Sequence, residues 1–188
     1  FLYQSGYLTI KGYDEGVYFL GIPNQEVRQS LNSIVLPALA MRRNGDIQSA
    51  QAMLTVHLRN GNLPEAKKLL KALIADVPYS NKKLASMDME ERYRLIMSTI
   101  FNAIGFRVEV EHMLSTGRID IVVETPRIIY VMELKLSNNG GISAAEQQIC
   151  ENRYIEPFKA DGRKVIALAV ELDAMGKGLV DWKVCQSN

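Results

Sequence analysis

The chain of 188 residues has little cysteine, no long apolar run and a net charge of only +1. Its two cysteines, Cys150 and Cys185, are too few for a disulfide framework and lack metal-site spacing, so we expect both to stay reduced in a cytoplasm. The absence of a run of about 18 apolar residues argues against a membrane span. The N-terminal segment lacks the basic region and apolar core of a signal peptide. Because the chain opens on Phe1 inside an apolar pattern, we expect it to be a piece of a longer protein.

The charge is spread unevenly along the chain. Residues 1–85 hold ten Lys or Arg against six Asp or Glu, whereas residues 86–188 hold twelve against fifteen. The second part therefore lacks the clustered basic charge of an autonomous nucleic-acid binder. A composition that is 47% hydrophobic and 23% charged is typical of a folded chain with one medium domain or two small ones.

Residues 1–85 have the patterns of a small helix-rich region. Residues 7–20 alternate as a β-hairpin does, and helical spacing follows Asn24. Residues 46–76 predict a helical hairpin, which breaks at the sequence NGN. A repeat protein needs about three such units, so we interpret residues 1–85 as a connecting region.

Residues 86–188 predict an α/β domain. Asp88 is suited to cap a helix that ends at Gly105, and the three strand-like runs FRVEVEHM, GRIDIVVET and IIYVMELKL follow. Next come a helix, ISAAEQQICENRYIEPF, and two strands, KVIALAVEL and GLVDWKVC. The order of helix, three strands, helix and strands favours a sheet with helices packed on it.

Charged residues interrupt two of the most apolar strands. In YVMELKLS, Glu133 and Lys135 share one face of the strand, and Asp120 stands between two isoleucines in the preceding strand. An unpaired charge in a central strand costs several kcal/mol, roughly the penalty for a buried ion. Such charges persist when they pair with each other, bind a metal or line a cleft.

If these two strands are hairpin neighbours, Asp120 and Glu133 face each other across the ladder. Two facing carboxylates favour a hard divalent cation such as Mg²⁺, and the Leu134 carbonyl is a further candidate ligand. Lys135 is then placed to orient an attacking water or to stabilise charge on a scissile phosphate. The combination suits metal-assisted phosphodiester hydrolysis. The alternative is a solvated strand face that carries ordinary paired charges.

The whole pattern is more specific than the tripeptide Glu-x-Lys. A carboxylate-bearing helix, Asp on the second strand, Glu-x-Lys on the third and a following helix with Gln resemble the PD-(D/E)XK nuclease superfamily. The run GRIDIVVETPRIIYVMELKL…QQI…Y…DGRKVIALAV…DWKV further resembles the nuclease-like C-terminal domain of bacterial proteins that begin with an AAA-ATPase-like domain. This likeness covers residues 86–188 and implies a restriction-endonuclease-like core.

The segment YQSGYLTIKGY…YFLGIPNQEVR also resembles the part that joins the two domains in that family. The chain contains no G-x-x-x-x-G-K-[ST] phosphate loop. We therefore expect an ATPase-like domain upstream in the native protein.

The resemblance assigns roles residue by residue. It implies that Asp120 and Glu133 are metal ligands for Mg²⁺ or Mn²⁺, and that Lys135 is the catalytic lysine. Glu90 matches the acidic residue of the first helix, or Glu91 does if the register slips. Gln148 and Tyr154 match the glutamine and the tyrosine of the later helix. Ile119 stands where the family has its proline.

Other polar residues near these positions have two interpretations. Arg118 is a candidate phosphate contact or a partner for the neighbouring Asp120. Glu111 and His112 are candidates for a second metal ligand or for a solvated strand end. Trp182 has the pattern of a core residue.

We expect a Mg²⁺-dependent endo- or exonuclease that acts on nucleic acid, with DNA favoured, as the C-terminal part of a larger ATPase-linked protein. Two alternatives remain open. One is a non-catalytic nuclease-fold module for binding or regulation. The other is an oligomerisation or regulatory arm of the ATPase, with the helical hairpin as its contact surface, which is compatible with a homo-oligomer. Neither alternative requires a divalent cation.

Overall fold

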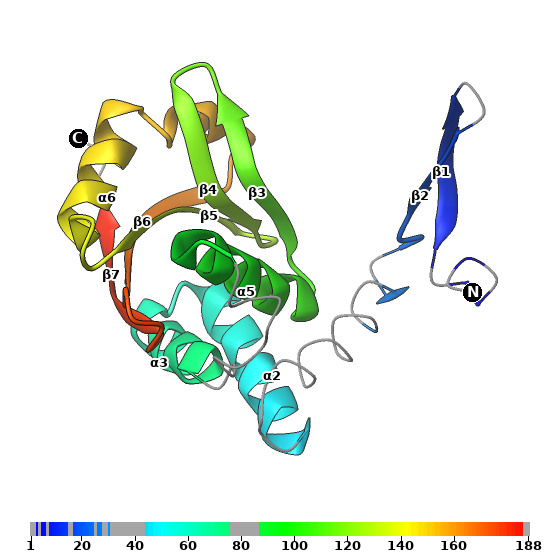
Figure 1. The fold of residues 1–188 in the computed structure, drawn as a ribbon, viewed down its shortest axis with the longest axis horizontal. Coiled ribbons are helices and arrows are strands. Elements are labelled where there is room, and N and C mark those ends of the chain that lie inside the picture. The colour runs from blue at the N-terminus through cyan, green and yellow to red at the C-terminus, as the bar shows by residue number, and fades with distance from the viewer. Residues whose placement is uncertain are drawn as a thin grey trace.

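The structure, a computed structural model, describes residues 44–75 and 87–185 without a gap (Figure 1). Nearer the N-terminus it describes residues 3, 5, 6, 8–14, 17–24, 26, 27 and 30. The helix predicted after Asn24 falls mostly outside the described residues, although Asn24 Oδ1 accepts a hydrogen bond from the Val27 N–H at 2.9 Å. The proposed division of the chain after residue 85 stays a prediction.

The predicted β-hairpin consists of β1 (Thr9–Asp14) and β2 (Val17–Gly21), which pair antiparallel. The predicted helical hairpin consists of α2 (Asn44–Asn60) and α3 (Leu63–Ala75). Gly61 lies in the turn between the two helices and has a φ of 70°, in the left-handed region that glycine adopts most readily.

The remaining elements form a five-stranded mixed sheet with helices on it. They are α5 (Met89–Ala103), β3 (Arg107–Leu114), β4 (Gly117–Glu124), β5 (Ile128–Leu136), α6 (Gly141–Glu151), the 3-10 helix η1 (Glu156–Asp161), β6 (Lys164–Leu172) and β7 (Leu179–Cys185). The strand order is β3-β4-β5-β6-β7, in which β5 and β6 run parallel and the other neighbours run antiparallel. This mixed α/β arrangement is consistent with the expected restriction-endonuclease-like fold.

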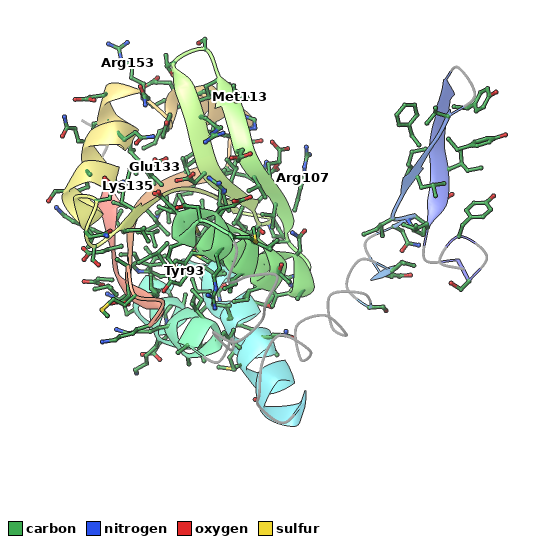
Figure 2. The ribbon with its side chains drawn as sticks, viewed as in Figure 1. Tyr93, Arg107, Met113, Glu133, Lys135 and Arg153 are labelled. Carbon is green, nitrogen blue, oxygen red and sulfur yellow. The ribbon has the colours of Figure 1, made fainter. Side chains whose placement is uncertain are left out.

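The alternation predicted for β5 determines which side chains enter which core. Tyr130, Met132 and Leu134 are fully buried in the larger core, together with residues of α2, α3 and α5. Ile129 and Val131 point to the opposite face, where a smaller core forms against α6. Helices thus cover both faces of the central strand β5, as Figure 1 shows. Glu133 and Lys135 lie on this strand (Figure 2).

The helix predicted over ISAAEQQICENRYIEPF is shorter than expected. α6 ends at Glu151, Arg153 takes a positive φ of 51°, and η1 follows from Glu156. Pro157 lacks an N–H and its ring would clash with a preceding carbonyl, so a continuous α-helix is disfavoured here. The break frees Tyr154 to turn back toward β4, where its hydroxyl donates to the Arg118 carbonyl at 2.8 Å.

Three further expectations concern the cysteines, Trp182 and the membrane. Cys150 and Cys185 are both free thiols. Trp182 belongs to the larger core, as predicted. Over the parts of the chain that the structure describes, no helix has the length and apolar character needed to cross a bilayer.

Candidate active site

The site lies where β4 and β5 separate. Their ladder runs from the turn out to the pair Ile121–Met132, and Asp120 and Glu133 come next on the two strands. Beyond this point β4 continues to pair with β3, and β5 continues to pair with β6. The separated strand ends are the floor of an opening in the sheet.

Asp120 compensates for the interrupted ladder with its side chain. Its Oδ2 accepts the Leu134 N–H at 2.9 Å, and its Oδ1 accepts Arg94 Nη1 at 2.8 Å. The residue is 7% exposed. The two strands expected to bring Asp120 and Glu133 together are indeed neighbours, and Asp120 contacts the backbone of the residue after Glu133.

Glu133 is a buried carboxylate with a hydrogen-bond donor at one of its two oxygens. Its Oε1 accepts Lys135 Nζ at 2.8 Å, while its Oε2 has no hydrogen-bond partner among the described residues. Only 1% of the residue is exposed. A buried carboxylate oxygen without a donor costs stability unless some other positive group satisfies it.

The environment shifts the acidity of both residues of this pair. Burial, and then the charge of Asp120, raise the pKa of Glu133 to about 7. Burial lowers the pKa of Lys135, but its hydrogen bond to Glu133 and the nearby carboxylates outweigh that effect, so the pKa of Lys135 is raised overall. Lys135 therefore carries its full positive charge at neutral pH.

The first helix contributes a second acidic group. Asp88 caps α5 by accepting the Glu90 N–H at 3.0 Å, which fixes the first turn of the helix beside the opening. Glu90 Oε1 lies 3.8 Å from Lys135 Nζ, is buried and lacks a hydrogen-bond partner within the described part of the chain. Burial raises the pKa of Glu90. Glu91 is exposed and lies outside this opening, so Glu90 is the acidic residue of the helix that faces the site.

The end of α6 supplies the opposite wall. Gln148 Nε2 and Asn152 Nδ2 each donate to the Tyr154 hydroxyl at 3.1 Å. Gly117 allows this close approach, because a Cβ there would lie 3.1 Å from both Asn152 Nδ2 and the Tyr154 hydroxyl. Gln148 and Tyr154 thus lie together in the wall. Sequence reasoning missed Asn152, which comes after the helix and has no motif of its own.

A second missed residue is Arg94, which follows Glu90 by one helical turn. Besides its bond to Asp120, its Nη2 lies 3.3 Å from Glu111 Oε1. Arg118 Nη1 approaches the same Glu111 oxygen at 3.0 Å. Arg118 thus pairs with Glu111 through its side chain, and Arg94 is the arginine that pairs with Asp120. The spacing of four residues from Glu90 was the signal that could have found Arg94.

His112 does not line this opening. Its Nδ1 lies 2.6 Å from Glu109 Oε2, and its ring lies against Phe158 on the side of the smaller core. Leu134 is fully buried and meets the site through its backbone.

The opening is a polar cleft of about 430 Å³. Its lining comes from α5, from the separated ends of β4 and β5, and from the end of α6. The lining residues are Asp88, Glu90, Arg94, Gly117, Arg118, Asp120, Glu133, Lys135, Gln148, Asn152 and Tyr154. All five side chains predicted to act in catalysis therefore lie around one cleft.

Comparison with known families gives an independent assignment. A family model of the PD-(D/E)XK nuclease superfamily matches residues 88–182, which is half of the chain. The chain belongs to the PD-(D/E)XK nuclease superfamily. The match begins at the cap of α5 and ends inside β7, so it spans every element that lines the cleft. Membership in this superfamily suggests a nuclease-type function.

A curated relative has 29% identity to the chain over 197 aligned residues. It is the "Uncharacterized protein in vnfD 5'region" of Azotobacter chroococcum mcd 1, and the alignment covers 97% of this chain but 36% of the relative. The chain thus spans about a third of that protein's length. No solved structure matches the chain with significance.

Nucleases of this superfamily typically use divalent metals, which bind through clustered oxygen ligands. In the described residues, no group of three or more His, Cys, Asp or Glu side chains is arranged to hold a metal ion. Two buried carboxylate oxygens, Glu133 Oε2 and Glu90 Oε1, nevertheless lack donors. Hard oxygen ligands without donors suit Mg²⁺ or Mn²⁺, which often bind through one or two carboxylates and water. Glu133 Oε2 and Glu90 Oε1 are therefore the two oxygens of the cleft that a bound cation would satisfy.

Proposed function

We propose that this protein is a Mg²⁺- or Mn²⁺-dependent nuclease that hydrolyses phosphodiester bonds, with DNA as its substrate. The observation that carries the proposal is the buried Glu133, which shares a cleft with Asp120 and Lys135 and has one oxygen without a donor. The family match adds the expectation of nuclease-type chemistry to this geometry.

Asp120, Glu133 and the Leu134 carbonyl would hold the cation. When bound, it supplies Lewis-acid stabilisation of the phosphate and a more acidic water. In the absence of a cation the pKa of Glu133 is raised to about 7. The positive charge of the cation would favour the ionised carboxylate and so keep Glu133 ionised.

Lys135 acts as a hydrogen-bond donor rather than as a base. Its raised pKa keeps the amine protonated at neutral pH, and its hydrogen bond to Glu133 fixes it beside the carboxylates. From there the ammonium orients the attacking water or neutralises charge that develops on the phosphate.

The rest of the cleft suits a phosphate backbone. Arg94 and Arg118 lie on the side of Asp120, and the amides of Gln148 and Asn152 lie on the α6 side. Phosphate contacts from arginine and amide side chains position a nucleic acid without reading its sequence. Residues 86–188 have a net negative charge, so we expect weak binding that depends on the cation.

We also propose that the protein works within a longer chain that carries an ATPase-like domain. The resemblance of residues 1–85 to a connecting region and the greater length of the relative support this arrangement. In the full-length protein, ATP should change the rate of cleavage, whereas residues 1–188 alone should not respond to ATP.

One observation favours a non-catalytic module as the second candidate. Both Asp120 oxygens already accept hydrogen bonds from the protein, one from Arg94 and one from the Leu134 N–H. A site that remains in this state would bind nucleic acid or a protein without a cation.

Cleavage of supercoiled plasmid with and without Mg²⁺ or Mn²⁺ separates the two candidates. The nuclease should nick the plasmid only with a cation, and Glu133→Gln should abolish nicking. Plasmid binding that is the same with and without cation, and never followed by nicking, would favour the binding module.

A further inference from the structure

Three carboxylates lie in one row across the sheet. The pairs Val110–Ile121 and His112–Ile119 place Glu111 of β3 opposite Asp120 of β4. The pair Ile121–Met132 then makes Glu133 of β5 the next residue opposite Asp120. Two spaces between neighbouring carboxylates result, one on each side of Asp120.

The two spaces differ in what they contain. Between Asp120 and Glu111 lies the Arg94 guanidinium, with Nη1 at 2.8 Å from Asp120 Oδ1 and Nη2 at 3.3 Å from Glu111 Oε1. On the other side, Lys135 bonds one oxygen of Glu133, and the second oxygen has no partner within residues 87–185. One space is therefore neutralised by the protein itself, and the other still has an unsatisfied anionic oxygen.

Arg94 is held firmly in its place. Its side chain is only 14% exposed, and it reaches the row from α5, which the Asp88 cap anchors. Glu111 turns toward it with a φ of 55°, a left-handed conformation that a glutamate seldom adopts in a strand. Arg118 Nη1 pairs with the same Glu111 oxygen at 3.0 Å and helps to hold it in place.

We infer that Arg94 occupies the place of a second metal ion, so that the cleft takes one divalent cation per chain. This inference rests on the proposed nuclease function and deepens it. In two-metal sites the ions lie about 3.5–4 Å apart and stabilise both the attacking and the leaving oxygen. Here the cation between Asp120 and Glu133 would serve one oxygen. The Arg94 guanidinium, with its fixed fork of donors, would serve the other phosphate oxygen.

The test is the number of Mn²⁺ ions bound per chain, measured by calorimetric titration of residues 1–188. The wild-type protein should bind one ion. Arg94→Met keeps much of the stem but removes the charge, which exposes Asp120 and Glu111 to each other, so it should bind two. Arg94→Lys keeps a charge in the same space and should bind one.

Arg118→Met is the matched control, because Arg118 pairs with Glu111 but makes no contact with Asp120 through its side chain. It should bind one ion, as the wild type does. Cleavage provides a second measurement: its rate should depend more steeply on Mn²⁺ concentration in Arg94→Met than in the wild type.

The outcomes separate the two proposals. Two ions in the wild type, or one ion in Arg94→Met, would overturn the role of Arg94 and leave the nuclease function standing. No bound ion in the wild type would overturn both. If Arg94→Met does not fold, the wild-type count and the Arg94→Lys count still decide, since two ions in either would contradict the inference.

Discussion

The two halves of β4 behave differently although they belong to one strand. From Ile121 to Glu124 the strand pairs on both sides, and its side chains enter two apolar cores. From Gly117 to Asp120 it pairs with β3 but has left β5. The first half stabilises the fold, and the second half opens the cleft.

Side chains replace the missing ladder in the open half. Asp120 accepts the Leu134 N–H, and the Tyr154 hydroxyl donates to the Arg118 carbonyl. Buried backbone groups are rarely left unpaired, so these two side chains allow the strands to separate without that cost. The comparison shows that a sheet can host a charged site when side chains satisfy its backbone.

The largest effect is expected at Lys135 in the open half. Lys135→Met should lower the cleavage rate on the order of 10²- to 10³-fold, because it removes a charged donor from the reacting group. Single-turnover plasmid nicking measures this rate. Lys164→Met, an exposed lysine on β6, is the control and should cleave normally. Equal rates in the two variants would contradict the role of Lys135.

A large effect on stability is expected in the paired half. Ile121 is fully buried, so Ile121→Ala should lower the free energy of unfolding by about 3 kcal/mol. Its partner across the ladder, Val110, is 43% exposed, and Val110→Ala should cost far less. Urea denaturation measures both. If the variants lose equal stability, the paired half is not the stabilising one.

The pH dependence of stability should report on Glu133. Its pKa is raised from 4.5 to about 7, so the folded state binds this proton more tightly than the unfolded chain does. The resulting stability is fully present below about pH 4.5 and is lost as the pH rises through about 7.

Without metal, the free energy of unfolding should therefore fall on the order of 2 kcal/mol between about pH 5 and pH 8. Glu133→Gln should reduce this slope, and Mg²⁺ should restore stability at the higher pH. Urea denaturation at several pH values measures the slope. A stability that rises over this range would contradict the assignment.

Two buried tyrosines offer the smallest and most closely matched comparison. The Tyr130 hydroxyl donates to the Leu58 carbonyl at 2.6 Å, away from the cleft, and the Tyr154 hydroxyl donates to Arg118 within it. Replacing Tyr130 with Phe should cost about 1 kcal/mol, the worth of one hydrogen bond, and replacing Tyr154 should cost at least as much, because its hydroxyl also accepts hydrogen bonds from Gln148 and Asn152. Tyr154→Phe alone should also slow cleavage, because Gln148 and Asn152 lose their common acceptor. Equal cleavage by the two variants would contradict this role for the wall.

The strands and the charged positions Asp120 and Glu133 were accessible to sequence reasoning for a physical reason. Period-two alternation in β5 and the isoleucines around Asp120 identify buried strands, and a charge inside such a strand stands out. The antiparallel neighbours β4 and β5 then bring Asp120 next to β5. Family resemblance added Glu90 and Gln148, which spacing alone did not distinguish from solvated helix residues.

Other features depend on three-dimensional contacts that no short pattern encodes. The contact of Tyr154 with the Arg118 carbonyl is one of them, whereas the early end of α6 has a signal in Pro157. In the sequence Arg94 has the pattern of an ordinary helix arginine, and its contact with Asp120 depends on the packing of α5 beside β4. The left-handed conformation of Glu111 likewise has no sequence signal, since glutamate rarely adopts it.

The central claim is that Glu133 becomes a cation ligand. The most direct test is calorimetric titration of Mg²⁺ at pH 7 in two buffers that differ in ionisation enthalpy. Because burial raises the pKa of Glu133 to about 7, binding of the cation should release protons from the wild type. In Glu133→Gln that release should disappear along with most of the affinity. No binding at millimolar Mg²⁺, or binding that Glu133→Gln leaves unchanged, would contradict the account.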